Sequence, residues 1–507
     1  AVIMSVVPKG QEQLVARADN YKIDTAGYTP LDYGYEGLKY NKAKDNFDRK
    51  KIPGNGPNPV VKVPQFWKKD LANGAKVIGA PNTEVPTVTF SLTIPGGHLT
   101  QANDLSKAGL ASFFTDMMME DTKNYTAEQL SVELQKLGSS ISVSSSVDGV
   151  IYTVQSLKKN FDKTLLLLEE RMLRPKFTDD AFTRIKKQIM ESFKVQKSQP
   201  AEVADAVFAR LNYGDKHILG ISQDGTEETV KNITLQDIQN YYNNYMTSNG
   251  ARVVIVGDIK QEEVLPKLNF LNKLPNKKIT LAKVNPTPPI DKTKVYLVDV
   301  PKSAQSEFRV GYATGLKYDA TGDYYKATLA NYSLGGGPNG RLFLNLREAK
   351  GWTYGADSYF SGNKYAGDFE LSTGIRGNVT DSALAEIMKE VNNYLQNGPT
   401  QEEVQFMKNA IGQRDALRYE TGVQKAQFIS RILEYSLPAN FIELQTKILN
   451  GMTAEQLTAT AKKYIQPEKL NILLVGDKAT ILDGVKKLGY DVVELDVDGN
   501  KMEKKTF

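Results

Sequence analysis

The chain has 507 residues, of which 40% are hydrophobic and 24% charged, an ordinary globular balance at a length that predicts several domains. Lys plus Arg (64) barely exceed Asp plus Glu (59), and basic residues form only short runs such as Lys186-Lys187, so a nucleic-acid partner is not expected. The absence of cysteine excludes disulfides, thiolate metal sites and a cysteine nucleophile. No apolar run approaches the ~20 residues of a transmembrane helix, so no membrane span is expected.

Residues 1–64 differ in composition from the rest of the chain. The apolar start, Ala1 to Val7, is too short for a signal peptide and lacks a basic start. A chain that begins at Ala is expected to have been trimmed or excised from something longer. A stretch rich in Gly, Pro, Asn and Tyr continues to about Pro64. Residues 1–64 are thus an arm, or else the last strand of a preceding domain (1–8) followed by a linker (9–64).

Residues 65–280 are predicted to form a first domain in which runs of strands alternate with runs of helices. Hydrophobic patterning predicts strands at 85–94, 140–146, 150–156 and 252–256, and helices at 105–120, 127–137, 179–196 and 235–245. A Pro-rich linker, 285–290, leads into a second domain at 281–507. There the pattern predicts strands at 294–298, 307–313, 353–362 and 368–374.

The two predicted domains are related by an internal repeat. TLQDIQNYYNNYMTSNGARVVIVGD, starting at Thr234, aligns without gaps with TAEQLTATAKKYIQPEKLNILLVGD, starting at Thr453, an offset of 219 residues. Each copy reads as a Thr-capped amphipathic helix followed by an apolar strand. The same offset places Leu110 on Leu329. The predicted fold class is therefore α+β, with two homologous domains that each pack a mostly antiparallel sheet with helices.

The order of features in the first domain resembles a known family. A strand ending in Gly96-Gly97 precedes Lys107-Ala-Gly-Leu-Ala111, and a Thr-capped helix then runs to Leu137-Gly138. This order is similar to that of the metal-binding domain of the pitrilysin/insulinase (inverzincin) zinc metallopeptidases. The resemblance extends over nearly the whole chain after about residue 60. It implies that this chain is one half of a clamshell-shaped peptidase.

The zinc motif of that family, H-x-x-E-H, is lost here. The matching run is Ser112-Phe-Phe-Thr-Asp116, so both histidines are replaced and Thr115 stands where the family has its general base. Glu191 lies near the position of the family's third ligand, but one carboxylate makes no zinc site, so we expect a solvated helix residue. The resemblance thus implies a chain that binds no metal and is inactive alone.

Both histidines of the chain stand apart from this motif. Neither His98 nor His217 has a partner at helical spacing. We expect His98 to cap the Gly-Gly turn and His217 to lie in a polar loop. Neither is expected to bind a catalytic metal.

The second domain carries the matching segments Leu334-Gly-Gly-Gly-Pro-Asn-Gly-Arg-Leu-Phe343 and Asn345-Leu-Arg-Glu-Ala-Lys-Gly-Trp-Thr-Tyr-Gly355. The resemblance implies that Arg347 and Tyr354 are a functional pair, and that Gly335, Gly336 and Gly337 face the substrate. The alternative is that Arg347 only complements a helix dipole and Tyr354 is a core aromatic. A phosphate-binding loop is discounted, because Gly340 is followed by Arg-Leu and not Lys-Ser/Thr.

The resemblance implies a function shared between two halves. A partner half, either upstream in the same polypeptide or a separate subunit, brings zinc. This chain brings Arg347 and Tyr354 to bind an extended peptide and stabilise the tetrahedral intermediate. The peptide is expected to add as a strand to a sheet edge. The alternative is a non-catalytic structural or binding homologue that serves as a scaffold subunit. An independent peptidase has little support, because no Ser/His/Asp order or paired-carboxylate motif is evident.

The expected compartment is the bacterial periplasm, with the cytoplasm as the alternative. This expectation rests on the trimmed start and on the abundance of Asn, Tyr and Lys.

Overall fold

The computed structural model describes residues 6–7, 9–11, 13, 27, 32–51, 54, 56 and 63–502, without the side chains of 415 and 416. Two compact units are present, Ala1–Pro57 and Asn58–Phe507. In the first unit, the described segment 32–51 holds turns, a stacked pair of rings (Tyr33 and Tyr35, 5.7 Å apart) and an ion pair between Arg49 and Asp45. Most of the strand considered for residues 1–8 lies outside the described residues.

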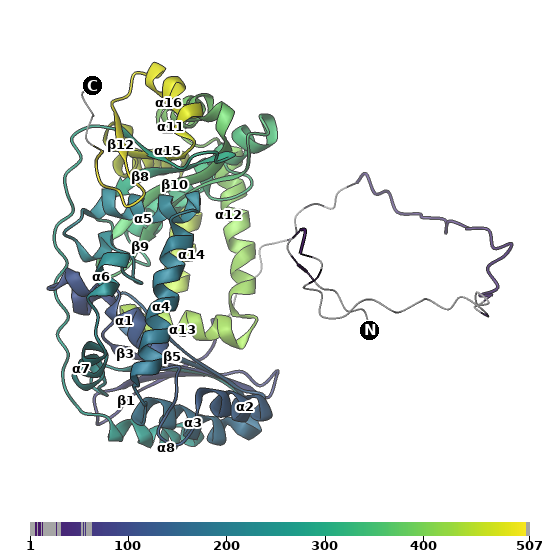
Figure 1. The fold of residues 1–507 in the computed structure, drawn as a ribbon. Helices are drawn as coiled ribbons and strands as arrows, with labels where there is room; N and C mark the ends of the chain where they lie inside the picture. The colour runs from purple at the N-terminus through teal and green to yellow at the C-terminus, as the bar shows by residue number, and fades with distance from the viewer. Residues whose placement is uncertain are drawn as a thin grey trace. The chain divides into compact units, whose positions relative to one another are not determined.

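The second unit contains two six-stranded sheets (Figure 1). The first has the order β1-β2-β6-β3-β5-β4 and the second β12-β7-β11-β8-β10-β9. The strands of the first sheet are β1 (Trp67–Asp70), β2 (Lys76–Pro81), β3 (Thr87–Pro95), β4 (Ser140–Ser145), β5 (Gly149–Leu157) and β6 (Arg252–Gly257). Those of the second are β7 (Lys294–Asp299), β8 (Gln305–Ala313), β9 (Thr353–Gly362), β10 (Gly367–Arg376), β11 (Asn471–Gly476) and β12 (Val492–Leu495).

Five strands of each sheet correspond in order and direction. β2 pairs with β6 in parallel as β7 does with β11, and the remaining shared pairs are antiparallel. The sixth strand differs, because β1 is an antiparallel strand that precedes the repeat and β12 is a parallel strand that follows it. The predicted fold class, two homologous mostly antiparallel sheets packed with helices, is confirmed.

One face of each sheet is covered by helices of its own repeat. The helices of the first repeat are α1 (Leu110–Met117), α2 (Ala127–Leu137), α3 (Phe161–Leu173), α4 (Asp179–Gln196), α5 (Pro200–Tyr213), α6 (Glu227–Lys231), α7 (Leu235–Tyr245) and α8 (Gln261–Lys267). The second contains α9 (Asp323–Gly335), α10 (Arg341–Phe343), the π-helix η7 (Leu344–Ala349), α11 (Thr380–Asn397), α12 (Gln401–Asp415), α13 (Gly422–Tyr435), α14 (Phe441–Gly451), α15 (Ala454–Tyr464) and α16 (Lys478–Lys487).

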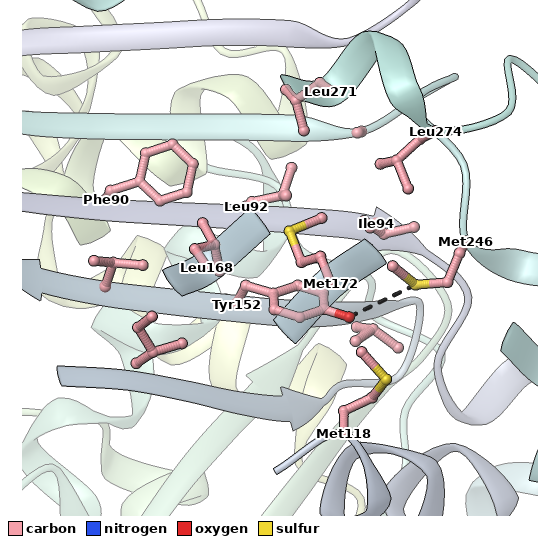
Figure 2. Close-up of a cluster of buried hydrophobic side chains, with 14 of the residues drawn as sticks. Phe90, Leu92, Ile94, Met118, Tyr152, Leu168, Met172, Met246, Leu271 and Leu274 are labelled. Carbon is pink, nitrogen blue, oxygen red and sulfur yellow. Dashed lines mark hydrogen bonds between the residues drawn. The ribbon is translucent and has the colours of Figure 1, made fainter. Parts of the chain in front are cut away.

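Figure 2 shows the core beneath the first sheet, where alternate residues of neighbouring strands point to the same face. Phe90, Leu92 and Ile94 of β3 lie beside Tyr152 of β5, all fully buried. Tyr152 places its hydroxyl 3.6 Å from the Met246 sulfur, the polar contact drawn in this cluster. Burying such side chains contributes roughly 1.5–3 kcal/mol each, which fixes the sheet against its helices.

The opposite face of each sheet is covered by a helix from the other repeat. α5, which follows the long helix α4, packs on β8 and β11 through Val203, Val207 and Phe208. α13, which follows α12, packs on β2 and β6 through Phe428 and Ile432. The repeats therefore exchange corresponding helices, which joins both sheets into one body.

The predicted helix at 105–120 is wrong at both ends. Gly109 adopts φ +96°, a left-handed conformation, so α1 begins at Leu110 and is preceded by a short 3-10 turn at Leu105–Lys107. The helices predicted at 127–137, 179–196 and 235–245 are confirmed with the same bounds. The Thr caps of the repeat, Thr234 and Thr453, both form capping boxes.

Candidate functional site

Arg347 and Tyr354 lie on one corner between helix and strand. Leu342 and Leu346 are fully buried and hold the segment α10–η7 against the second core. The corner turns at Gly351, which has φ +62° and donates its N–H to the Arg347 carbonyl at 2.9 Å. β9 then begins at Thr353. The helix that carries Arg347 thus ends at a glycine, and its last turn is a π-helix and not an α-helix.

Both side chains of this corner reach solvent. The Tyr354 side chain is 86% exposed, which makes the core-aromatic alternative wrong. Arg347 is 41% exposed, with its guanidinium 5.7 Å from the centre of the Phe343 ring and 3.5 Å from Glu348. A phenol and a guanidinium are both hydrogen-bond donors, so the corner presents donors to whatever approaches it.

The three glycines before the corner have different environments. Gly335 is buried, and a Cβ there would lie 2.2 Å from the Ser358 hydroxyl oxygen, so this glycine allows α9 to pack on β9. Gly336 is exposed and Gly337 is partly exposed. Gly336 and Gly337 therefore reach the surface beside the corner, and Gly335 does not.

The outer edge of β9 is partly closed by α9. The Asn331 amide donates to the Ser358 carbonyl at 2.6 Å, and the Tyr324 hydroxyl donates to the Phe360 carbonyl at 3.2 Å. These carbonyls belong to alternate residues of the sheet's last strand. Since α9 already occupies them, a peptide cannot add as a strand along this part of β9.

The segment matching the zinc motif does not fit a metal. On α1, the Ser112 hydroxyl donates to Asp224 at 2.6 Å and the buried Thr115 hydroxyl donates to the Ser112 carbonyl at 2.7 Å. Glu191 is 60% exposed and lies 3.9 Å from Lys187, as a solvated helix residue would. Within the part of the chain that the structure describes, no three His, Cys, Asp or Glu side chains are grouped to hold a metal ion.

Asp116, in the second histidine position, has an unusual environment. Asp116 reaches solvent, but partial desolvation by its surroundings and the nearby carboxylates Asp224 and Glu120 raise the pKa of Asp116 to about 6. A serine, a threonine and an aspartate at the three motif positions give neither the imidazole ligands nor the general base that zinc hydrolysis needs.

The two histidines have structural roles. His98 is buried, and its Nε2 lies 2.8 Å from the Ile218 carbonyl, so the expectation that it caps the Gly-Gly turn is wrong. His217 is also buried: its Nδ1 accepts from the Leu219 N–H and its Nε2 lies 2.8 Å from the Asn285 carbonyl. Burial lowers the pKa of both rings, which keeps them neutral. His217 follows the exposed polar residues Asp215 and Lys216 of the expected polar loop, although its own side chain is buried.

Sequence reasoning missed the residues that anchor the corner. Arg341 makes a two-pronged contact with Glu403, and the Asn345 amide donates to Glu386 and Glu390. The partners lie 41 to 62 residues further along the chain, so no local spacing connects them. The sequence signal for these anchors was that the polar Arg341 and Asn345 lie close to the apolar Leu342, which is buried in the structure.

A two-sheet fold with a degenerate metal motif in its first repeat and an exposed Arg–Tyr corner in its second defines an inactive-type homologue of a zinc peptidase. The description "Insulinase (Peptidase family M16)" matches residues 76–217, and "Peptidase M16 inactive domain" matches residues 232–411. Together these ranges cover more than half of the chain. The chain belongs to the insulinase (M16) family, and the resemblance drawn from the sequence is confirmed.

Known relatives include both non-peptidases and peptidase subunits. "Non-peptidase homolog YmxG" of Helicobacter pylori is 25% identical over 386 residues, covering 76% of this chain and 87% of that protein. "Mitochondrial-processing peptidase subunit beta" of Blastocladiella emersonii is 22% identical over 435 residues, covering 83% and 90%. The crystal structure of a peptidase M16 inactive domain from Pseudomonas fluorescens has a TM-score of 0.74 at 23% identity, covering 81% and 98%, which shows the fold.

The described part of the chain also contains no helix long and apolar enough to cross a membrane.

Proposed function

We propose that this chain is the non-zinc half of an M16 peptidase, which pairs with a zinc-bearing half to enclose a peptide. The single observation that carries this proposal is the exposed Tyr354 on the same corner as Arg347, a corner that buried leucines hold in place. An 86% exposed tyrosine has no packing role in the described chain. Its orientation therefore suits contact with something outside.

In the proposed reaction, this chain contributes only hydrogen-bond donors. The Arg347 guanidinium binds carbonyl oxygens of the peptide. The Tyr354 hydroxyl donates a hydrogen bond to the oxyanion that forms when water adds to the scissile carbonyl, which is worth on the order of 10²–10³ in rate. The loss of the motif at Ser112 and Asp116 leaves water activation to the partner half.

The peptide is proposed to meet this half mainly through side chains. The edge of β9 at Ser358 and Phe360 is occupied by α9, which closes it to an added strand. Gly337, where an added Cβ would meet nothing within 4 Å, leaves room for the backbone of a peptide.

A peptide-hydrolysis assay with zinc tests this proposal. This chain, its zinc-bearing half, the mixture, and the mixture with Tyr354→Phe or Arg347→Ala are compared. Activity in the mixture alone, reduced about 10²-fold by Tyr354→Phe, supports the proposal. Activity in the mixture that neither substitution lowers contradicts the proposal. Because Tyr354 is exposed, the Phe variant is expected to keep its thermal midpoint, which separates a catalytic loss from unfolding.

A scaffold or binding subunit is the second candidate, and the name of the Helicobacter pylori relative, a non-peptidase homolog, favours it. On this function, the chain pairs with another protein without contributing to hydrolysis. The same assay separates the two functions, since a scaffold tolerates both substitutions. The compartment is proposed to be the bacterial periplasm, which cell fractionation tests.

A further inference from the structure

The corner that carries Arg347 and Tyr354 is fixed by charged contacts to two other helices, in addition to its buried leucines. The Arg341 Nε and Nη2 atoms each lie 2.8 Å from an oxygen of Glu403, near the start of α12. Nη2 also donates to the Gly398 carbonyl at 2.9 Å, and the guanidinium lies 5.1 Å from the centre of the Tyr394 ring. Such two-pronged Arg–carboxylate contacts define direction as well as distance.

A second set of contacts holds the middle of the corner. The Asn345 amide nitrogen lies 3.1 Å from Glu386 Oε2 and 2.8 Å from Glu390 Oε1, both on α11. This amide interaction lowers the pKa of Glu386, which keeps its carboxylate ionised. Lys350, at the end of η7, lies 3.8 Å from the same Glu386 and 4.9 Å from the centre of the Trp352 ring.

The contacts of Arg341 and Asn345 matter because the segment that they hold is a π-helix. A π-turn is a rare and weakly populated local conformation that must be held by its surroundings. Here Arg341 is the first residue of α10, which runs directly into the π-helix, and both Asn345 and Arg347 lie within the π-helix. A shift of either anchor therefore changes the direction of Arg347 and, through Gly351, the start of β9, in which Tyr354 is the second residue.

We infer that Arg341, through Glu403, and Asn345, through Glu386 and Glu390, are positioning residues for Arg347 and Tyr354. This inference rests on the proposed function for its catalytic consequence. Its structural part stands independently: the anchors determine the conformation of the corner. Neither anchor is expected to touch the peptide, since the oxygens of Glu403 already engage Arg341 and the amide of Asn345 is already used.

The first test needs no partner and uses Trp352 as a reporter. The chain has two tryptophans, so Trp67→Phe leaves Trp352, between Arg347 and Tyr354, as the single fluorophore. In this background, Arg341→Gln and Asn345→Ala are expected to raise acrylamide quenching of Trp352 about twofold, with an unchanged far-UV circular dichroism spectrum. Arg174→Gln removes a comparable Arg–Glu contact (2.8 Å to Glu170) in the first repeat and serves as the matched control. Quenching that stays at the parent value in both anchor variants overturns the inference.

The second test measures turnover in the mixture with the zinc-bearing half. Arg341→Gln is expected to lower kcat at least about tenfold with little change in KM, since ~1 Å of misplacement can cost on the order of 100-fold. Arg341→Lys, which keeps the charge without the two-pronged contact, is expected to restore part of this loss. A full kcat in Arg341→Gln, while Tyr354→Phe is impaired, overturns the inference and leaves the proposed function intact. If the mixture keeps its full kcat with Tyr354→Phe and with Arg347→Ala, the proposed function itself is contradicted.

Discussion

Tyr213 and Asp368 join the two repeats: the Tyr213 hydroxyl, at the last residue of α5, donates a 2.6 Å hydrogen bond to Asp368 Oδ2 on β10. The Ser361 hydroxyl donates to the same oxygen at 3.2 Å, and Asp368 Oδ1 is buried without a hydrogen-bond partner. The exchanged helix α5 therefore ends on a carboxyl group that is only half satisfied.

Asp368→Asn is expected to stabilise the protein at neutral pH. Burial raises the pKa of Asp368, so the folded state holds this proton more tightly than the unfolded state does. The free energy of unfolding thus falls as pH rises from the unfolded pKa, about 3.9, through the higher folded pKa. The Asn variant carries no such penalty, so its thermal midpoint should exceed that of the wild type at pH 7 and converge with it near pH 3.

Tyr213→Phe is the matched variant. It removes the hydrogen bond from Tyr213, so less of the cost of burying the Asp368 carboxylate is offset. The loss should lower the free energy of unfolding by about 1–3 kcal/mol at pH 7. In the Asp368→Asn background, the same change should cost less. Equal costs in both backgrounds would show that the hydrogen bond is not coupled to the charge.

Asp116 is expected to titrate well above an ordinary aspartate. Partial desolvation and the charges of Asp224 and Glu120 raise the pKa of Asp116 to about 6, so its carboxyl carbon should show a midpoint near pH 6 in a ¹³C NMR titration. Asp224→Asn should lower that midpoint, because it removes a neighbouring negative charge. The titration of Asp116 should make the free energy of unfolding fall as pH rises from about 4 to 6, since the folded state favours the protonated form. A midpoint near 4 would contradict the environment described for α1.

Restoring two histidines on α1 is expected to create a metal-binding pair. Ser112→His with Asp116→His places two imidazoles one helical turn apart on α1, the spacing used by zinc-binding helices. The double variant should bind Zn²⁺ at least about tenfold more tightly than either single variant, a difference of about 1.4 kcal/mol, as measured by isothermal titration calorimetry. Equal affinity of single and double variants would show that the two positions do not face one ligand.

Gly335→Ala should destabilise the second repeat. The added Cβ would lie 2.2 Å from the Ser358 hydroxyl oxygen and 2.5 Å from its backbone nitrogen, so α9 must move away from β9 at a cost of about 1–3 kcal/mol. Gly451→Ala, where a Cβ meets nothing within 4 Å, is the control and should be neutral or slightly stabilising. Urea denaturation of both variants checks this, and a neutral Gly335→Ala would contradict the close packing.

Local chemistry in the sequence determined much of this protein. The repeat, the Thr234 and Thr453 helix caps, and the strand at Thr353–Gly362 were all predicted from the sequence, because each depends on residues within a few positions. The loss of the zinc motif at Ser112 and Asp116 was equally local. So was the Gly351 stop that turns the chain between Arg347 and Tyr354.

Tertiary structure decided which partner each buried surface takes. An amphipathic pattern shows that a helix such as α5 buries one face, but not that the face lies on the sheet of the other repeat. The tertiary structure likewise buries Gly335 while Gly336 is exposed. It also places the His98 ring against the Ile218 carbonyl, whereas the sequence predicted that His98 caps the Gly-Gly turn. The contacts of Arg341 with Glu403 join residues 62 positions apart. Such contacts depend on the packing of whole elements, which local spacing in a sequence does not specify.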